Sequence, residues 1–183
     1  KDKITKQLGN GKLLSQLSKK IVVFNFREKD LENNGQGAPL TPIFHNLLSN
    51  DIYNKKNELP NILNIGGISN VTMTVHNKDL NKKKFEAFDI GPGNCLIDEW
   101  IRKNSNKRFD KNGLIAKSGK INELILNQAI ENFGEISFDK SLDIKDFDIS
   151  FARGLSLEDG CATITNFTAY LISEGIKFSY KRD

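Results

Sequence analysis

The stretch Phe85-Glu86-Ala87-Phe88-Asp89-Ile90-Gly91-Pro92-Gly93-Asn94 decides how the rest of the chain is interpreted. Its apolar start favours a short strand, and Gly91-Pro92-Gly93 predicts that this strand stops at once. Asn94 is a preferred helix N-cap, and apolar residues recur behind it at helical spacing: Leu96, Ile97, Trp100 and Ile101. Asp89 is therefore expected at the C-terminal end of a strand, a common place for chemistry in α/β proteins. An aspartate that only caps the turn explains the same pattern.

The composition is that of a globular chain with a modest positive charge. The 183 residues are 38% hydrophobic and 27% charged, and 27 basic against 23 acidic residues give a net charge of +4. This length suits one domain or two small ones. The basic run Lys82-Lys83-Lys84 has no aromatic residues among its lysines, which disfavours nucleic-acid binding. No apolar run approaches the roughly 20 residues of a membrane span, so a membrane role is also disfavoured.

The cysteines and histidines do not indicate a metal or disulfide site. Cys95 and Cys161 lie in apolar surroundings without ligand spacing, which is typical of small core residues in a reduced, cytoplasmic protein. His45 and His76 are not clustered, so no metal site is predicted. The chain opens at Lys1 without Met or a signal-peptide pattern, and we expect it to be a piece of something longer.

The first part of the chain predicts two helices with a strand between them. Leucines within residues 13–17 form one face of a short helix. Residues 21–26 predict a strand buried on both faces, with Arg27 following at its C-terminal end. Pro42 is expected to open the second helix.

A glycine-rich loop over residues 33–40 separates the predicted strand from the second helix. Gly35 and Gly37 would let the backbone approach a ligand closely, and Gln36 offers both a donor and an acceptor. A plain connecting loop is the alternative. Further on, the polar, lysine-rich residues 51–60 predict a boundary between two parts of the chain.

Residues 62–75 predict a β-hairpin. An apolar strand is followed by Gly66 and Gly67 as the turn, and a second strand then alternates apolar residues with threonines. Ser69 and Asn70 lie just beyond the turn, where backbone N–H groups could hold a phosphate. A hairpin without a ligand is the alternative. A charged hook is expected to connect this hairpin to the strand that ends on Asp89.

The last third predicts helices joined by turns. A helix is expected over residues 121–130, and residues 138–147 are polar and irregular. Ser156, with an acid three residues later, predicts the start of a long helix. Its expected buried side is Ile164, Phe167, Leu171 and Ile172.

Together these segments resemble one family, the anhydro-N-acetylmuramic acid kinases of peptidoglycan recycling. The resemblance covers nearly the whole chain, in the family's order and at compatible spacings. It is carried by Leu8-Gly9-Asn10, Phe26-Arg27 with Asp30, Gly35-Gln36-Gly37-Ala38-Pro39-Leu40, Asn64-Ile65-Gly66-Gly67-Ile68-Ser69-Asn70-Val71, Phe88-Asp89-Ile90-Gly91-Pro92-Gly93-Asn94 with Asp98 and Trp100, and Lys140-Ser141-Leu142-Asp143 before Phe147.

The resemblance implies an α/β, actin/hexokinase-like (ribonuclease H-like) two-lobed kinase fold, of which this chain would hold the central part. Residues 1–50 would end the first lobe, and residues 51–183 would form an incomplete second lobe. Such an enzyme uses ATP and Mg²⁺, opens the 1,6-anhydro bond of its small sugar substrate with water, and phosphorylates O6 to give N-acetylmuramic acid 6-phosphate. A cytoplasmic location follows, no nucleic acid or membrane is implied, and a homodimer is compatible.

The resemblance also implies roles for single residues. Asp89 corresponds to the general base that deprotonates the attacking water. The sugar would lie near Arg27, Gln36 and Gly37. The nucleotide phosphates would lie near Gly66, Gly67, Ser69 and Asn70.

The chain departs from the family's pattern in several places. The family's Ser-Gly-Thr-Ser-type phosphate loop is missing ahead of Lys1, and its Gly-rich adenosine segment is missing after Asp183. Asn34 stands where a glycine is usual, and Glu28-Lys29 replaces a more arginine-rich pair. We therefore expect this chain alone to bind ATP poorly. Two alternatives stay open: another sugar kinase of the same superfamily, and a non-catalytic sugar-binding or interaction protein derived from such a kinase.

Overall fold

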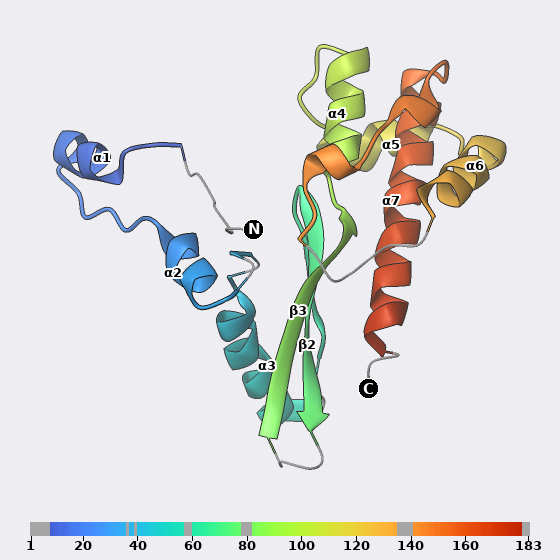
Figure 1. Ribbon diagram of the computed structural model, residues 1–183. Helices are drawn as coiled ribbons and strands as arrows, with labels where there is room; N and C mark the ends of the chain where they lie inside the picture. The colour runs from blue at the N-terminus through green and yellow to red at the C-terminus, as the bar shows by residue number, and fades with distance from the viewer. Residues whose placement is uncertain are drawn as a thin grey trace. The chain divides into compact units, whose positions relative to one another are not determined.

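A computed structural model describes residues 8–35, 37–38, 40–56, 60–77, 82–134 and 141–180 (Figure 1). The chain forms two compact units, Lys1–Thr41 and Pro42–Asp183. Helices and one antiparallel sheet are both present, so the predicted α/β class is confirmed. Gln36 and Lys140, which the sequence singled out, lie outside the described residues.

The first unit holds helices α1 (Gly11–Ser18) and α2 (Phe26–Glu32). The leucine-bearing helix is confirmed as α1, and the side-chain oxygen of Asn10 caps it by accepting from the Leu13 amide at 3.0 Å. None of the α1 residues is buried, so its leucine face is exposed within the described chain. Local capping, rather than packing, therefore accounts for the position of this helix.

The predicted strand over residues 21–26 is wrong. Residues 21–25 have no regular secondary structure, and Phe26 already begins α2, so Arg27 lies in a helix. Ile21 is 96% exposed, where burial on both faces was expected. A strand needs a hydrogen-bonded neighbour, and the only sheet among the described residues is made by three strands of the second unit. Apolar composition alone cannot supply that neighbour.

The second unit contains a three-stranded antiparallel sheet in the order β1 (Ile62–Ile65), β2 (Ile68–Asn77) and β3 (Lys82–Pro92). The predicted hairpin of β1 and β2 is confirmed. The predicted end of β3 at Asp89 is wrong, because Gly91 and Pro92 still pair with β2. In the described sheet β3 pairs only with β2, and a proline that lacks an N–H is tolerated in such an edge strand.

Helices occupy most of the remaining second unit. They are α3 (Pro42–Lys56), α4 (Cys95–Asn104), α5 (Leu114–Ser118), α6 (Glu123–Phe133) and α7 (Leu157–Tyr180), with short 3-10 turns at Lys111–Gly113, Ile144–Asp146 and Ser150–Ala152. The helix starting at Pro42 and the long helix starting after Ser156 are confirmed, as is the N-cap contact from the Asp159 amide to the Ser156 hydroxyl at 3.1 Å. The described helices include none that is both long enough and apolar enough to cross a membrane.

Helix α3 occupies part of the segment that the sequence assigned to a lobe boundary. It runs to Lys56, and the imidazole Nδ1 of His45 lies 2.7 Å from the Thr72 hydroxyl of β2. The division between compact units accordingly falls between Thr41 and Pro42. A lobe boundary at residues 50/51 of a complete enzyme stays a prediction.

Helix α7 organises the core of the second unit. Its predicted buried side is confirmed: Ile164, Phe167, Leu171 and Ile172 are all buried. One cluster of buried side chains joins α7 to α4, α5 and α6, and a second joins it to β2 and β3. Figure 1 shows α7 running alongside α5 and α6. Cys95 and Cys161 are buried and free, as predicted. Burial and the neighbouring Asp110 raise the pKa of the Cys161 thiol to about 12.

Gly175 lets α7 approach β3 closely, and this contact generates a first prediction. A Cβ added at Gly175 would collide with Ile90 Cβ and approach Ile90 Cα to 3.3 Å. We expect Gly175→Ala to destabilise the second unit by about 1–3 kcal/mol, the usual cost of overpacking a core. Chemical denaturation measures the change. Ser173→Ala, nearby on the same helix, is the control and should stay within about 0.5 kcal/mol of the wild type. If Gly175→Ala is more stable than the wild type, α7 does not pack as closely against β3 as this contact indicates.

Candidate functional site

Asp89 is a buried carboxylate that two distant segments hold in place. It lies on β3, and the residue is 8% exposed. The Leu142 amide donates to its Oδ2 at 2.9 Å, which joins β3 to the segment just before the 3-10 turn at Ile144–Asp146. Among the described residues no other hydrogen bond reaches the Asp89 carboxylate, so Oδ1 has no protein partner in this part of the chain. One oxygen is anchored and the other can meet a ligand.

Burial changes the acidity of this group. Loss of solvent raises the pKa of Asp89 above its ordinary value of 3.8, and the weaker opposing effect is the hydrogen bond from Leu142. A carboxylate with a raised pKa holds a proton more strongly than an exposed one, so it is a better base near neutral pH. The environment thus suits proton transfer.

Polar side chains form a row across the sheet at this point. Asn64 pairs with Asn70, and Asn70 pairs with Asp89. Directly opposed residues of antiparallel strands project from the same face, so the three side chains share one face of the sheet. Their strand neighbours Val71 and Phe88 project from the other face, where they pack in the cluster with Ile172 of α7. The sheet therefore has an apolar face against α7 and a polar row beside Asp89.

The Gly66-Gly67 turn is attached to the start of α4. The Gly67 carbonyl accepts from the amides of Gly93 at 2.9 Å and Cys95 at 3.3 Å, and the Gly66 carbonyl accepts from the Asn94 amide at 2.7 Å. A Cβ on Gly93 would collide with the Gly66 carbonyl oxygen, so this junction requires glycine there. Asn94 stands at the predicted N-cap position, but its side chain makes no capping bond. The hairpin backbone satisfies the helix start instead.

The hairpin residues proposed to contact phosphate differ in which of their hydrogen-bonding groups are already engaged within the protein. The Ser69 side chain is fully buried and its hydroxyl donates to the Pro92 carbonyl at 3.2 Å. The carbonyls of Gly66 and Gly67 are engaged with α4, so backbone N–H groups are the atoms through which this turn could bind an anion. An added Cβ at Gly67 meets no atom within 4 Å, so the turn is open at that residue.

The residues expected near the sugar lie in the first unit. Arg27 is on α2, and a Cβ added at Gly37 would lie 3.7 Å from the Arg27 Cβ, so the structure brings these two together. Gly37 has a positive φ of 76°, and its amide donates to the Asp30 carboxylate at 2.7 Å. Asp30 thus organises the glycine-rich loop, a role that its place in the motif did not reveal.

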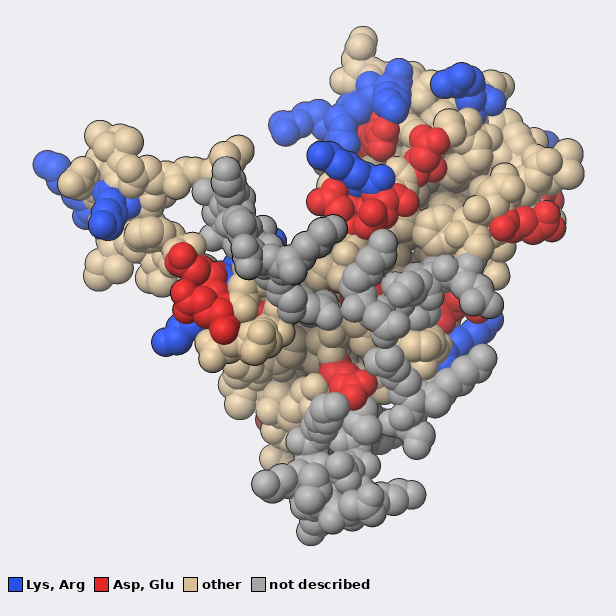
Figure 2. All heavy atoms as spheres, viewed as in Figure 1, with Lys and Arg blue, Asp and Glu red and all other residues tan. Residues whose placement is uncertain are grey.

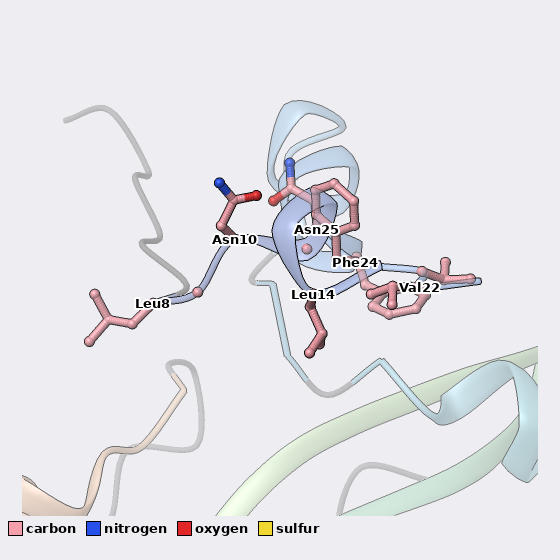
Figure 3. Close-up of a pocket in the computed structure, with 10 residues that line it drawn as sticks. Leu8, Asn10, Leu14, Val22, Phe24 and Asn25 are labelled. Carbon is pink, nitrogen blue, oxygen red and sulfur yellow. The ribbon is translucent and has the colours of Figure 1, made fainter. Parts of the chain in front are cut away.

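Two cavities were not indicated by the sequence. The first, of about 850 Å³, lies in the first unit around α1; Figure 3 shows its lining, from Leu8 to Phe26. The described residues of its walls are largely apolar and include no titratable side chain, so they offer no group for proton transfer. The second, of about 360 Å³, lies among α4, α5 and α7. Its Asp110 carboxylate already accepts from the amides of Ile115 and Ala116 at 2.9 and 3.0 Å.

Acidic and basic side chains on α4 form pairs of opposite charge, so no patch of one sign forms over this helix. Asp98 lies 3.8 Å from Arg102, and Glu99 lies 2.5 Å from Lys103; Figure 2 shows acidic and basic side chains next to one another over this helix. Among the described residues, no group of three His, Cys, Asp or Glu side chains is arranged to hold a metal ion. Asp89 and the adjoining hairpin are therefore the candidate site in the second unit.

Comparisons with known proteins agree on one family. The sequence matches the family described as anhydro-N-acetylmuramic acid kinase over residues 1–180. A relative of that name from Pelagibacter ubique is 53% identical over 177 residues, which cover 96% of this chain and 46% of the relative. Relatives with the same name from Legionella pneumophila (strain Paris) and Zymomonas mobilis are 38% and 36% identical, with 94% and 97% of this chain covered. The chain spans about half the length of these curated relatives.

The raised pKa of Asp89 predicts a pH-dependent cost to stability. The folded state binds the proton more tightly than the unfolded state does, so this contribution to stability is fully present below about pH 3.8 and is lost as the pH rises through the raised value. We expect Asp89→Asn to gain stability relative to the wild type on going from acidic to neutral pH. Denaturation at a series of pH values measures this difference.

Asp148 provides a control of opposite sign. The Ser150 hydroxyl is the main cause that lowers the pKa of this exposed carboxylate. Its contribution to stability is present above the unfolded pKa and is lost as the pH falls, so Asp148→Asn should lose stability relative to the wild type toward neutral pH. If Asp89→Asn changes stability equally at acidic and neutral pH, burial does not control its titration.

Proposed function

Because the chain belongs to the anhydro-N-acetylmuramic acid kinase family, we propose that the complete protein converts 1,6-anhydro-N-acetylmuramic acid to N-acetylmuramic acid 6-phosphate with ATP and water. The described α/β part is consistent with a portion of an actin/hexokinase-like kinase. The observation that carries the proposal is the buried Asp89 carboxylate, held by Leu142 beside a glycine hairpin. A base of raised pKa and backbone donors are the groups that such a reaction requires.

We assign Asp89 the role of general base. The oxygen of a water molecule forms a bond to the anomeric carbon while the bond from that carbon to O6 breaks, and the water's proton passes to Asp89. O6 takes the terminal phosphoryl group of ATP, and ADP leaves. The hydrogen bond from Leu142 to Oδ2 fixes the rotation of the carboxylate, which leaves Oδ1 for the water.

The glycine hairpin is proposed to meet the nucleotide phosphates. Gly66 and Gly67 would contribute backbone N–H groups, and the buried Ser69 would hold the turn through its hydrogen bond to the Pro92 carbonyl. Asn70 would contribute its side-chain amide nitrogen. ATP would supply the phosphoryl group, and a Mg²⁺ ion bound with it would neutralise charge on its phosphates. The described residues offer no dedicated metal cage, which fits an ion that arrives on the nucleotide.

The glycine-rich loop and the start of α2 are proposed to bind the sugar. Arg27, Gln36 and Gly37 would bind the sugar, and Asp30 would hold their loop through the Gly37 amide. The reaction is placed in the cytoplasm, where ATP is available. A lobe division at residues 50/51 and a homodimer are further predictions about the complete protein.

Replacement of Asp89 tests the catalytic role. In a chain extended to the length of its relatives, Asp89→Asn keeps the shape and a hydrogen-bonding group but removes the base. We expect kcat to fall by about 10²–10⁴-fold, the usual effect of losing a positioned general base. This equals roughly 3–5 kcal/mol of transition-state stabilisation. KM for the anhydro sugar should change far less, because the proton moves only on the way to the transition state.

The control for this experiment is Asp98→Asn. Asp98 lies in the first turn of α4 and faces Arg102 at 3.8 Å, so its loss should cost only a helix-dipole interaction of about 0.3–1 kcal/mol. Steady-state kinetics of both variants decide the assignment. If Asp98→Asn is inactive and Asp89→Asn is active, our proposal has assigned the general base to the wrong carboxylate.

The 183-residue chain alone provides a separate test of the nucleotide site. The hairpin offers few N–H groups, and adenosine recognition requires others that we expect from the rest of the family's length. We therefore expect ATP with Mg²⁺ to bind this chain weakly or not at all in a calorimetric titration. A micromolar dissociation constant would show that residues outside this proposal build the nucleotide site.

A further inference from the structure

The side-chain oxygen of Asn70 is buried and has no hydrogen-bond partner among the residues that the structure describes. Two buried polar side-chain atoms are in this position within the described chain, Asn70 Oδ1 and Thr168 Oγ1, and only Asn70 pairs with Asp89 in the sheet. An unpartnered buried acceptor is costly to a folded protein, so such an atom in a candidate site suggests a missing ligand.

The hydrogen-bonding chemistry of Asp89 and Asn70 restricts which molecule can bind between their side chains. The Asp89 carboxylate and the Asn70 oxygen are both acceptors, so they cannot hydrogen-bond to each other while Asp89 is ionised. A molecule that satisfies both must donate two hydrogens from one small centre. Water does this, whereas a phosphate group, which only accepts once it is fully ionised, does not.

We propose that Asn70 Oδ1 accepts one hydrogen of the attacking water while Asp89 Oδ1 accepts the other. The inference rests on the proposed function, because it deepens the role of Asp89 as the base. The hydrogen bonded to Asp89 leaves as the transferred proton, and the hydrogen bonded to Asn70 stays on the oxygen that joins the anomeric carbon. Two acceptors fix the direction of the water's lone pair, which a single carboxylate does not.

The sheet geometry supports this arrangement. Asn70 and Asp89 are a directly opposed cross-strand pair, and such pairs place their Cβ atoms about 4.5–5.5 Å apart. The register shifts next to this pair, so Ile90 is the extra residue of a β-bulge, a feature that re-aims neighbouring side chains. Leu142 occupies Asp89 Oδ2 and leaves Oδ1 for the water.

This role is compatible with the phosphate contact proposed for the same residue. The acceptor oxygen would face the water, and the amide nitrogen would remain a donor for a nucleotide oxygen. One side chain would thereby position both the attacking water and the nucleotide phosphate.

Truncation of Asn70 is the first test, in a chain extended to the length of its relatives. We expect Asn70→Ala to lower kcat about 10²-fold, the scale of a misplaced reacting group. The matched control is Asn64→Ala, which removes the same side chain from the same row one strand further from Asp89 and should leave kcat unchanged. A rate for Asn70→Ala equal to that of Asn64→Ala overturns the proposal.

Replacement of Asn70 by aspartate tests the pH–rate profile, which would not change if Asn70 had only a structural role. Asn70→Asp keeps an acceptor oxygen but adds a second carboxylate beside Asp89, which should raise the pKa of Asp89. We expect activity to return toward the wild type at alkaline pH, with the acid limb of the pH–rate profile moved to higher pH. Asn64→Asp should move that limb much less. Equal profiles for the two aspartate variants contradict the proposal.

A measurement on the 183-residue chain keeps the test independent of turnover. Carbon NMR of the Asp89 carboxyl follows its titration in the wild type, Asn70→Asp and Asn64→Asp, and only Asn70→Asp should raise the midpoint markedly. An unmoved midpoint in Asn70→Asp overturns the proposed adjacency. If the extended wild-type chain does not turn over the anhydro sugar, the proposed function fails; if Asp89→Asn keeps full turnover, the assignment of Asp89 as the base fails; if Asp89→Asn is inactive while Asn70→Ala is normal, only the role of Asn70 fails.

Discussion

The pairing of β2 with β3 controls the second unit, because its register decides what each face of the sheet presents. Val71 and Phe88 are opposed on the face that packs against α7, while Asn70 and Asp89 are opposed on the other. Side chains alternate along a strand, so a slip of one residue would move Asp89 into the apolar cluster and Phe88 out of it. The bulge at Ile90 allows β3 to keep Ile90 against Gly175 of α7 while Asp89 stays beside Asn70.

The hairpin turn and α4 depend on each other in a similar way. Helix starts leave backbone amides without partners, and the carbonyls of Gly66 and Gly67 satisfy two of them, those of Asn94 and Cys95, and also accept from the Gly93 amide just before the helix. The same bonds orient the turn, so its remaining N–H groups are held in place before any ligand binds. Gly93 is essential to this contact, because a side chain there would push the turn away from the helix. A junction that satisfies the helix start therefore also preorganises a candidate anion site.

Two features of the candidate site lower the stability of the folded chain, and the proposed chemistry explains both. Burial of the Asp89 carboxylate disfavours its charged form, and a single backbone amide offsets this only in part. Asn70 Oδ1 is buried without a partner in the described chain. Both features oppose folding, and both suit a site that must hold a water molecule and take its proton. The same sheet supplies the compensation on its other face, where apolar residues pack against α7.

Local patterns were sufficient for the hairpin, for α1, α3, α4 and α7, and for the family that matches the chain, because turn residues, caps and helical spacing act over a few neighbours. They also indicated Asp89. They failed for residues 21–26, whose strand-like composition has no paired neighbour in the described sheet, and for the end of β3, where Gly91 and Pro92 continue the pairing. The contact of Leu142 with Asp89, the polar row with Asn70 and the attachment of the hairpin to α4 were beyond sequence patterns. Each joins residues far apart in the chain or depends on strand register, and register is settled only when both faces of the sheet find their partners.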